Sequence, residues 1–184
     1  MTAEAPTFLP YGRDLTRADL DALPDDGHRY ELIDGALIVT PAPRIRHQVV
    51  LVRLFRVLDD ARADGLVVLV APVDVVLSDS TVMQPDVLVA PRADFTEKDL
   101  PAAPLLAVEI LSPSTRGIDL LLKKDRLERA GCQHYWVVDP DEPSITAWDL
   151  VDGRYRQATR AVGDEEFAVE APLPVRLVST ALVG

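Results

Sequence analysis

A glutamate occurs inside an apolar segment, where an ionised side chain would be costly. Residues 105–111 read Leu-Leu-Ala-Val-Glu-Ile-Leu, and proline and serine bound them on either side. An apolar run of this length is typical of a strand buried on both faces. A carboxylate there is strongly destabilising unless it is paired, hydrogen-bonded or bound to a metal ion. Glu109 therefore indicates a functional site, an ion pair with an arginine, or an edge strand whose polar side faces water.

A second acid stands at the start of the preceding apolar segment. Gln84, Pro85 and Asp86 lead into residues 87–90, which are all apolar. Because Pro85 favours extended backbone before it and cannot donate a hydrogen bond, Asp86 is expected where a strand begins. It is either a functional acid or an ordinary turn aspartate. Two acids on neighbouring strands suit a divalent ion such as Mg²⁺, which takes few protein carboxylates and keeps several waters.

A lysine follows the two acids. The chain has three lysines, and two of them, Lys123 and Lys124, fall in a segment expected to be helical from residue 115 or 119 to about residue 130. At about 100° per residue, Lys123 falls on the same arc as Leu120 and Leu127. Lys123 is therefore expected to point inward, and Lys124 toward solvent or an ion pair. Two acids, a divalent ion and a lysine suit metal-assisted phosphodiester hydrolysis.

Three further side chains are secondary candidates. Asp119 lies four residues before Lys123, so it either orients the lysine or caps the helix. Glu31 lies on an expected hairpin strand and is either a third acid of the site or an exposed residue. His47 lies near the start of an expected long helix. It is either a surface histidine beside arginines or a further residue of the site.

Helices and strands are expected to alternate around these residues. We expect helices over residues 16–23, 44–63 and 115–130, and strands over residues 29–33, 36–40, 66–71, 73–77, 86–90, 105–111, 134–138, 144–149 and 155–159, with further edge strands within residues 165–178. The Asp-Gly pairs at 34–35 and 152–153 predict tight hairpin turns. The order predicts one mixed α/β domain over residues 1–184, in which helices flank a sheet and residues 1–12 form a flexible segment.

Composition limits the classes of protein that fit. The chain has 184 residues, 48% of them apolar and 27% charged, which is enough for one domain with a core. We find no transmembrane run and no secretory signal, and the lone Cys132 excludes an internal disulfide, so a cytoplasmic location and no membrane partner are expected. A net charge of −11 argues against a protein that coats nucleic acid non-specifically.

Together the motifs resemble the Uma2-like restriction endonuclease family, a branch of the PD-(D/E)xK nuclease superfamily. The resemblance spans about residues 30–150. It rests on Tyr-Glu-Leu-Ile-Asp-Gly at 30–35, Gln-Pro-Asp at 84–86, Val-Glu-Ile-Leu-Ser-Pro-Ser-Thr at 108–115 and Tyr-Trp-Val-Val-Asp-Pro at 135–140, together with His47, Asp119 and Lys123. It implies a restriction-endonuclease-like core, a central mixed β-sheet flanked by helices, preceded by an N-terminal helix and β-hairpin.

The resemblance also implies a site and an activity. Asp86 and Glu109 would hold Mg²⁺ or Mn²⁺, with Glu31 and Lys123 completing the catalytic set and His47 and Asp119 supporting it. The resemblance implies that His47 binds a phosphate or holds Glu31. The basic superfamily motif has its lysine two residues after the second acid, where this chain has Leu111. In the Uma2-like pattern the lysine lies on the following helix, and Lys123 matches that position.

Three functions remain open at this stage. The first is a metal-dependent endonuclease that cleaves DNA as a homodimer, because cutting two strands requires two sites. The second is a catalytically silent accessory protein that retains the nuclease fold, and the third is a hydrolase of another phosphodiester. The net charge favours the second function, whereas the complete set of acids and lysine favours the first.

Overall fold

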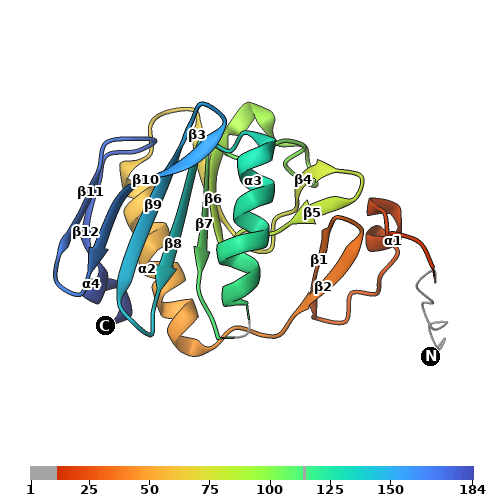
Figure 1. Cartoon of the computed structure of the whole chain (residues 1–184), viewed down its shortest axis with the longest axis horizontal. Helices are drawn as coiled ribbons and strands as arrows, with labels where there is room; N and C mark the ends of the chain where they lie inside the picture. The colour runs from red at the N-terminus through yellow and green to blue at the C-terminus, as the bar shows by residue number, and fades with distance from the viewer. Residues whose placement is uncertain (1–11, 114) are drawn as a thin grey trace.

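A six-stranded mixed sheet lies at the centre of the structure (Figure 1). The computed structural model describes residues 12–113 and 115–184, so the segment 1–12 that was expected to be flexible lies, except for Gly12, outside the described residues. The strands follow the order β10-β9-β8-β7-β6-β3. Their bounds are β3 (Leu66–Val70), β6 (Val87–Pro91), β7 (Leu106–Ile110), β8 (His134–Asp139), β9 (Ser144–Val151) and β10 (Arg154–Val162). The predicted mixed α/β fold is confirmed.

One pair of neighbouring strands in this sheet, β7 and β8, runs parallel, and the other pairs run antiparallel. Parallel strands need a crossover connection, usually a helix. Here the crossover consists of a π-helical turn, η2 (Ile118–Lys123), which continues directly into the α-helix α3 (Lys124–Ala130). The single helix expected over this segment therefore begins with a wider turn, and that turn carries two of the candidate residues, Asp119 and Lys123.

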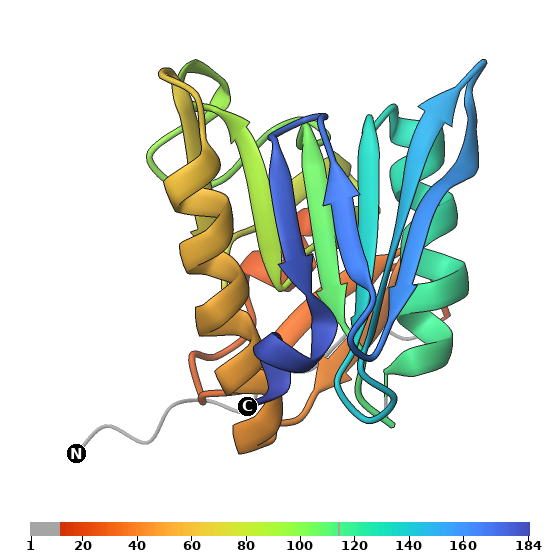
Figure 2. The same cartoon turned by 90° about the vertical axis from the view of Figure 1, so that its left-hand side faces the viewer.

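Two helices lie on opposite faces of the sheet. Figure 2 shows α2 (Ile45–Ala61) on one side of the strands and α3 on the other. A hydrophobic core lies on each face of the sheet, and side chains along β7 point to the two faces in turn. Leu106, Val108 and Ile110 belong to the core on the α2 side, whereas Ala107 belongs to the core on the α3 side. Glu109 is two residues after Ala107 and therefore lies on the same face of β7, so the side chain of Glu109 points toward η2 and α3.

A smaller sheet beside α3 carries the N-terminal hairpin (Figure 1). Its strands follow the order β2-β1-β5-β4, with bounds β1 (Arg29–Ile33), β2 (Ala36–Thr40), β4 (Val75–Ser78) and β5 (Thr81–Met83). The Asp-Gly turn predicted between β1 and β2 is present, with φ of 52° at Asp34 and 77° at Gly35. No strand was expected between residues 77 and 86, but Thr81–Met83 form β5, which pairs with β1 at Leu32 and Val82.

The remaining elements close the two ends of the molecule. The helix α1 (Arg17–Asp21) follows the N-cap residue Thr16, whose backbone N–H donates to Asp19 Oδ2 at 2.8 Å, as in a capping box. A short 3₁₀ turn, η1 (Arg92–Asp94), follows β6. The C-terminal segment forms a separate two-stranded sheet, β11 (Glu166–Val169) with β12 (Val175–Val178), and ends in α4 (Ser179–Val183). Among the described residues, no helix combines the length and the apolar character needed to cross a bilayer.

Candidate active site

The register between β6 and β7 brings two of the predicted acids together. Val87 pairs with Val108 in this antiparallel ladder, and the same register continued by one residue places Asp86 opposite Glu109. The backbone N–H of Ile110 donates to Asp86 Oδ2 at 2.8 Å. Both acids are almost completely buried, with Asp86 3% exposed and Glu109 1% exposed. Asp86 and Glu109 therefore meet where β6 begins and β7 ends.

Lys123 extends from η2 into a group of three acids. Its Nζ lies 2.9 Å from Glu31 Oε1, 3.3 Å from Glu109 Oε1 and 3.7 Å from Asp119 Oδ1. The lysine side chain is 2% exposed, in agreement with the inward direction expected from helical periodicity. Burial opposes its charged form, but attraction to Glu109, Glu31 and Asp119 outweighs burial and raises the pKa of Lys123 above its usual range. The side chain is therefore held as an ammonium ion.

Glu31 is a buried acid of the site and not an exposed strand residue. Its side chain is 1% exposed, and its Oε1 accepts the backbone N–H of Gln84 at 2.7 Å in addition to contacting Lys123. Gln84 directly precedes the segment that carries Asp86, so this hydrogen bond joins the small sheet to the start of β6.

An arginine that the sequence analysis missed connects two of the acids. Arg29 Nη1 donates to Asp86 Oδ1 at 3.1 Å, and Arg29 Nη2 donates to Glu31 Oε2 at 3.4 Å. A signal for it existed, because Arg29 and Glu31 are two residues apart on one strand and therefore share a face. Burial opposes the charge on Arg29, but the surrounding Glu31, Asp86 and Glu109 raise its pKa. This buried cation offsets part of the negative charge of the site.

His47 contacts Asp86. One of its predicted roles, holding Glu31, is therefore wrong. Its Nε2 lies 3.2 Å from Asp86 Oδ2, and its side chain is 11% exposed, so it is not a surface histidine. Burial alone would raise the pKa of Asp86, but the hydrogen bond and charge of His47, with Arg29 and the N–H of Ile110, lower it to about 2. Asp86 is therefore ionised at neutral pH.

The pKa of Glu109 is shifted in the opposite direction from that of Asp86. Burial raises the pKa of Glu109 well above its usual range, and the nearby acids Asp119, Asp86 and Glu31 add to this, whereas Lys123 opposes it. Its Oε2 is buried and has no hydrogen-bond partner among the described residues. A buried carboxylate oxygen without a partner is costly, so this atom marks a position where a ligand would be stabilising.

Asp119 lies on η2, and its side chain is 2% exposed. Burial raises the pKa of Asp119, and the attraction of Lys123 opposes that shift. The contact with Lys123 favours the predicted role of orienting the lysine, although the backbone N–H of Asp119 also bonds to the carbonyl of Thr115 at 2.9 Å, as in the first turn of a helix. Its backbone carbonyl in turn accepts a hydrogen bond from Tyr135 Oη at 2.7 Å.

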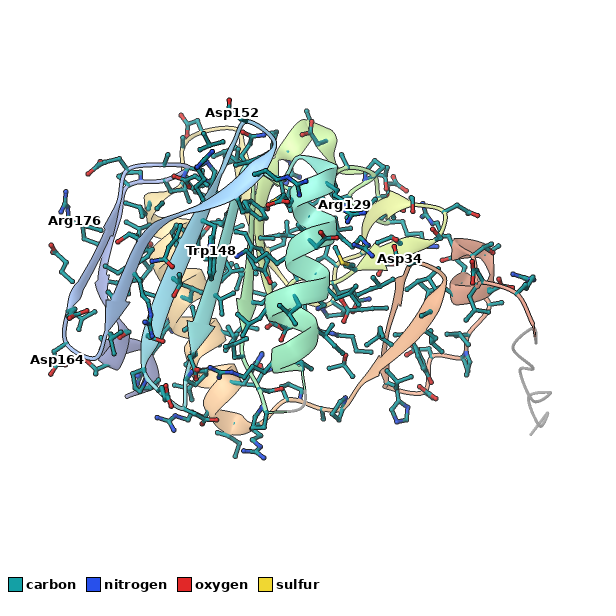
Figure 3. The ribbon with its side chains drawn as sticks, viewed as in Figure 1. Asp34, Arg129, Trp148, Asp152, Asp164 and Arg176 are labelled. Carbon is teal, nitrogen blue, oxygen red and sulfur yellow. The ribbon has the colours of Figure 1, made fainter. Side chains whose placement is uncertain are left out.

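Lys124, the neighbouring lysine, points away from the acids. Its Nζ lies 3.7 Å from the centre of the Trp148 ring, which Figure 3 labels beside α3. The side chain is partly buried, and this desolvation lowers the pKa of Lys124 while Glu128 opposes the shift. Lys124 was expected to face solvent or an ion pair, but its ammonium group makes a cation–π contact instead.

A pocket of about 610 Å³ gives access to the site. Its wall includes Asp86, Glu109 and Asp119 together with the basic side chains of Arg29 and His47. The segment between β2 and α2 and the segment after β7 form its rim, through residues 40–44 and through Ser112, Pro113 and Thr115. Lys123 and Glu31 are not part of the wall, but Lys123 contacts two residues that are, Glu109 and Asp119. A substrate in this pocket would therefore meet Asp86 and Glu109 first.

The donor set fits a hard divalent cation through two carboxylates. No group of three or more His, Cys, Asp or Glu side chains within residues 12–113 and 115–184 is arranged to hold a metal ion. Mg²⁺ is nonetheless usually held by one or two carboxylates and completes its octahedral shell with water and substrate oxygens. Asp86 is ionised, and Glu109 has an unpartnered oxygen in the same pocket. These two acids are therefore the residues that would hold the ion.

Comparisons with known proteins extend over most of the chain. The family model Uma2, described as "Putative restriction endonuclease", matches residues 17–181. No curated protein matches the chain. Among solved structures, the chain is similar to a crystal structure from Anabaena variabilis ATCC 29413 described as "a putative nuclease belonging to DUF820". The TM-score is 0.71 at 21% sequence identity, with 92% of this chain and 97% of that chain covered, so the two share a fold.

Proposed function

This chain belongs to the Uma2 family, and from that membership and the buried acid–lysine cluster we propose that it is a metal-dependent endonuclease that hydrolyses phosphodiester bonds in DNA. The observation that carries the proposal is the arrangement of Lys123 against Glu31, Glu109 and Asp119, next to a pocket that Asp86, Glu109 and Asp119 line. Structural ion pairs of this burial are rare, because each ion loses its hydration. A retained cluster at the base of a pocket is typical of catalysis.

Asp86 and Glu109 would hold the cofactor, Mg²⁺ or Mn²⁺. When bound, such an ion lowers the pKa of a coordinated water and polarises the scissile phosphate. Arg29 and His47 keep Asp86 ionised and in one orientation, because they bind its two oxygens from two different elements. The guanidinium groups of Arg29 and Arg44 face the same pocket, and a phosphate diester entering it would find positive charge there.

Lys123 supplies a fixed positive charge. Three acids hold it as an ammonium ion, so it cannot accept a proton as a general base at neutral pH. Its role is electrostatic: from behind the pocket wall, where it contacts Glu109, the ammonium group stabilises the negative charge that develops on the phosphate. Glu31 and Asp119 keep the ammonium in place, which is a positioning role and not direct contact with substrate.

The alternative is a catalytically silent accessory protein that retains the fold. The net charge of −11 favours it, because DNA binding normally relies on contacts between phosphates and basic side chains. The buried cluster favours the enzyme, because an interaction protein has no use for an unpartnered carboxylate oxygen inside a pocket. We propose DNA and a divalent ion as the partners, and a homodimer as the working unit for cutting both strands.

The test is DNA cleavage by purified protein with Mg²⁺ or Mn²⁺, on single-stranded, duplex and branched substrates. Wild-type protein should cut at least one of them, and EDTA should abolish cutting. Lys123→Met, which keeps the length of the side chain, should lower kcat on the order of 10²-fold, and metal affinity measured by calorimetry should change little. Circular dichroism verifies that the variant is folded.

Lys124→Met is the matched control, because it alters the adjacent lysine on the same helical segment. It should retain cleavage and lose only the contact with Trp148, about 0.5–1 kcal/mol of stability. Wild-type protein that leaves all three substrates intact would support the accessory protein instead. Damage from Lys124→Met without damage from Lys123→Met would contradict the assignment of the catalytic lysine.

A further inference from the structure

The backbone that carries Lys123 is π-helical, which is rare in proteins. The turn η2 is π-helical over Ile118–Lys123, whereas the following α3 is an ordinary α-helix. A π-helical turn closes i→i+5 hydrogen bonds, is rare, and occurs frequently at functional sites. Both Asp119 and Lys123 are buried on this turn and lie 3.7 Å apart through Oδ1 and Nζ. The turn therefore determines where the ammonium group is placed.

A side chain from the sheet is hydrogen-bonded to this turn. Tyr135 of β8 is completely buried, and its hydroxyl donates to the backbone carbonyl of Asp119 at 2.7 Å. A carbonyl oxygen has two lone pairs, so a donor outside the helix can bind it in addition to a helical N–H group. The Tyr135 ring is fixed in turn by stacking on Tyr155, with centroids 5.8 Å apart, and by Trp148 at 6.1 Å.

We propose that Tyr135 is a positioning residue that holds the π-helical turn in the geometry in which Lys123 meets Glu31 and Glu109. The hydroxyl binds the turn four residues before the lysine, from a strand whose own position is fixed by parallel pairing with β7. Glu109 and Tyr135 are therefore positioned by the same pair of strands, while the lysine is positioned relative to Glu109 through the hydroxyl. The expected effect of Tyr135 on catalysis rests on the proposed function, but its effect on the position of Lys123 does not.

The chain provides a matched control for this contact. Tyr155 lies in the same aromatic group, and its hydroxyl also donates to a backbone carbonyl, that of Cys132, at 2.9 Å. Cys132 lies beyond the C-terminal end of α3, whereas η2 lies at the opposite end of this continuous helical segment. Tyr135→Phe and Tyr155→Phe therefore each remove one hydroxyl and one hydrogen bond to backbone, and only Tyr135→Phe releases the turn that carries Lys123.

The experiment measures the NMR signal of the Lys123 ammonium group and its exchange with water. Protein labelled with ¹⁵N at lysine Nζ should give three ammonium resonances, one for each of Lys98, Lys123 and Lys124, and Lys123→Arg assigns the third. In wild-type protein the buried Lys123 signal should be protected from exchange with water. We expect Tyr135→Phe to shift this signal or remove its protection, and Tyr155→Phe to leave it unchanged, with both variants folded by their amide spectra.

Cleavage kinetics give the second measurement. Tyr135→Phe should lower kcat about 10-fold or more while KM changes little, because displaced catalytic groups reduce turnover and not ground-state binding. A Lys123 signal unaffected by Tyr135→Phe, or affected equally by both variants, would overturn the proposal, and so would loss of the whole fold. If wild-type protein cleaves nothing, the proposed function fails, and the lysine resonance still decides the role of Tyr135.

Discussion

Asp86 and Glu109 carry the same functional group but are bound very differently. Both oxygens of Asp86 accept hydrogen bonds, from Arg29 on one side and from His47 and the N–H of Ile110 on the other. One oxygen of Glu109 contacts Lys123, and the other has no partner among the described residues. Asp86 is therefore a preorganised anion, whereas Glu109 is the acid that a bound cation would stabilise most.

At this scale we predict that metal binding depends on both acids. Asp86→Asn and Glu109→Gln should each weaken Mn²⁺ binding measured by calorimetry, by at least the roughly 10–100-fold that loss of an outer-sphere partner costs. These isosteric changes are preferred to alanine. Asp86→Ala would leave the N–H of Ile110 and one N–H of Arg29 without their acceptor, at a cost of about 1–3 kcal/mol for each buried group, whereas the amide oxygen of asparagine can still accept a hydrogen bond.

Glu170→Gln is the control for these variants, since Glu170 is exposed and pairs with Arg176 on the surface. Its Mn²⁺ affinity should equal that of wild-type protein. Equal affinity in Asp86→Asn, Glu109→Gln and wild type would exclude this pair of acids as the metal site.

At the scale of elements, two hairpins with the same turn residues have different surroundings. Gly35 and Gly153 each follow an aspartate in a tight turn and have positive φ, 77° and 73°. A Cβ at Gly35 would lie 2.4 Å from Asp14 Cβ, whereas a Cβ at Gly153 would meet nothing within 4 Å. The turn of the first hairpin is therefore packed against the chain that precedes α1, and the second is open.

We predict that Gly35→Ala destabilises the protein clearly more than Gly153→Ala does. Gly153→Ala should cost about 1–2 kcal/mol, because a side chain is placed in the left-handed region. Gly35→Ala should exceed this cost, since Asp14 must also move. Urea unfolding of the two variants measures the difference, and equal losses of free energy would show that Asp14 is not packed as described.

For the molecule as a whole, the net charge affects the association of two copies of the chain. A charge of −11 makes two copies repel each other, and salt screens that repulsion over about 8–10 Å at physiological ionic strength. Arg29 and Lys123 offset part of the charge of the acids in the candidate site, which reduces the contribution of these acids to the repulsion between copies.

We predict a homodimer whose affinity increases with salt. Sedimentation equilibrium should give twice the 20.2 kDa of one chain, with a dissociation constant that falls as NaCl is raised from about 0.01 M to 0.15 M, where the Debye length shortens from about 30 Å to 8 Å. A monomer at all concentrations and salt levels would contradict the dimer and would limit the enzyme to cutting one strand at each encounter.

The sequence by itself determined the features whose signals are local. Glu109 was identifiable because an acid is conspicuous in an apolar strand, and Lys123 because helical periodicity distinguishes an inward lysine from its neighbour. The hairpin turns followed from Asp-Gly pairs, whose backbone requirement is met by few other residues. The mixed sheet flanked by helices followed from the order of these elements along the chain.

Only the tertiary structure decided which residues act together. Arg29 joins Asp86 to Glu31, His47 turns to Asp86, and Tyr135 binds the turn that carries Lys123. Each contact depends on which strands are neighbours and in what register, as with β1 beside β5 and β6 beside β7. Strand neighbours and register are selected by burial summed over the whole core, and alternation along a single strand contains no information about its partner.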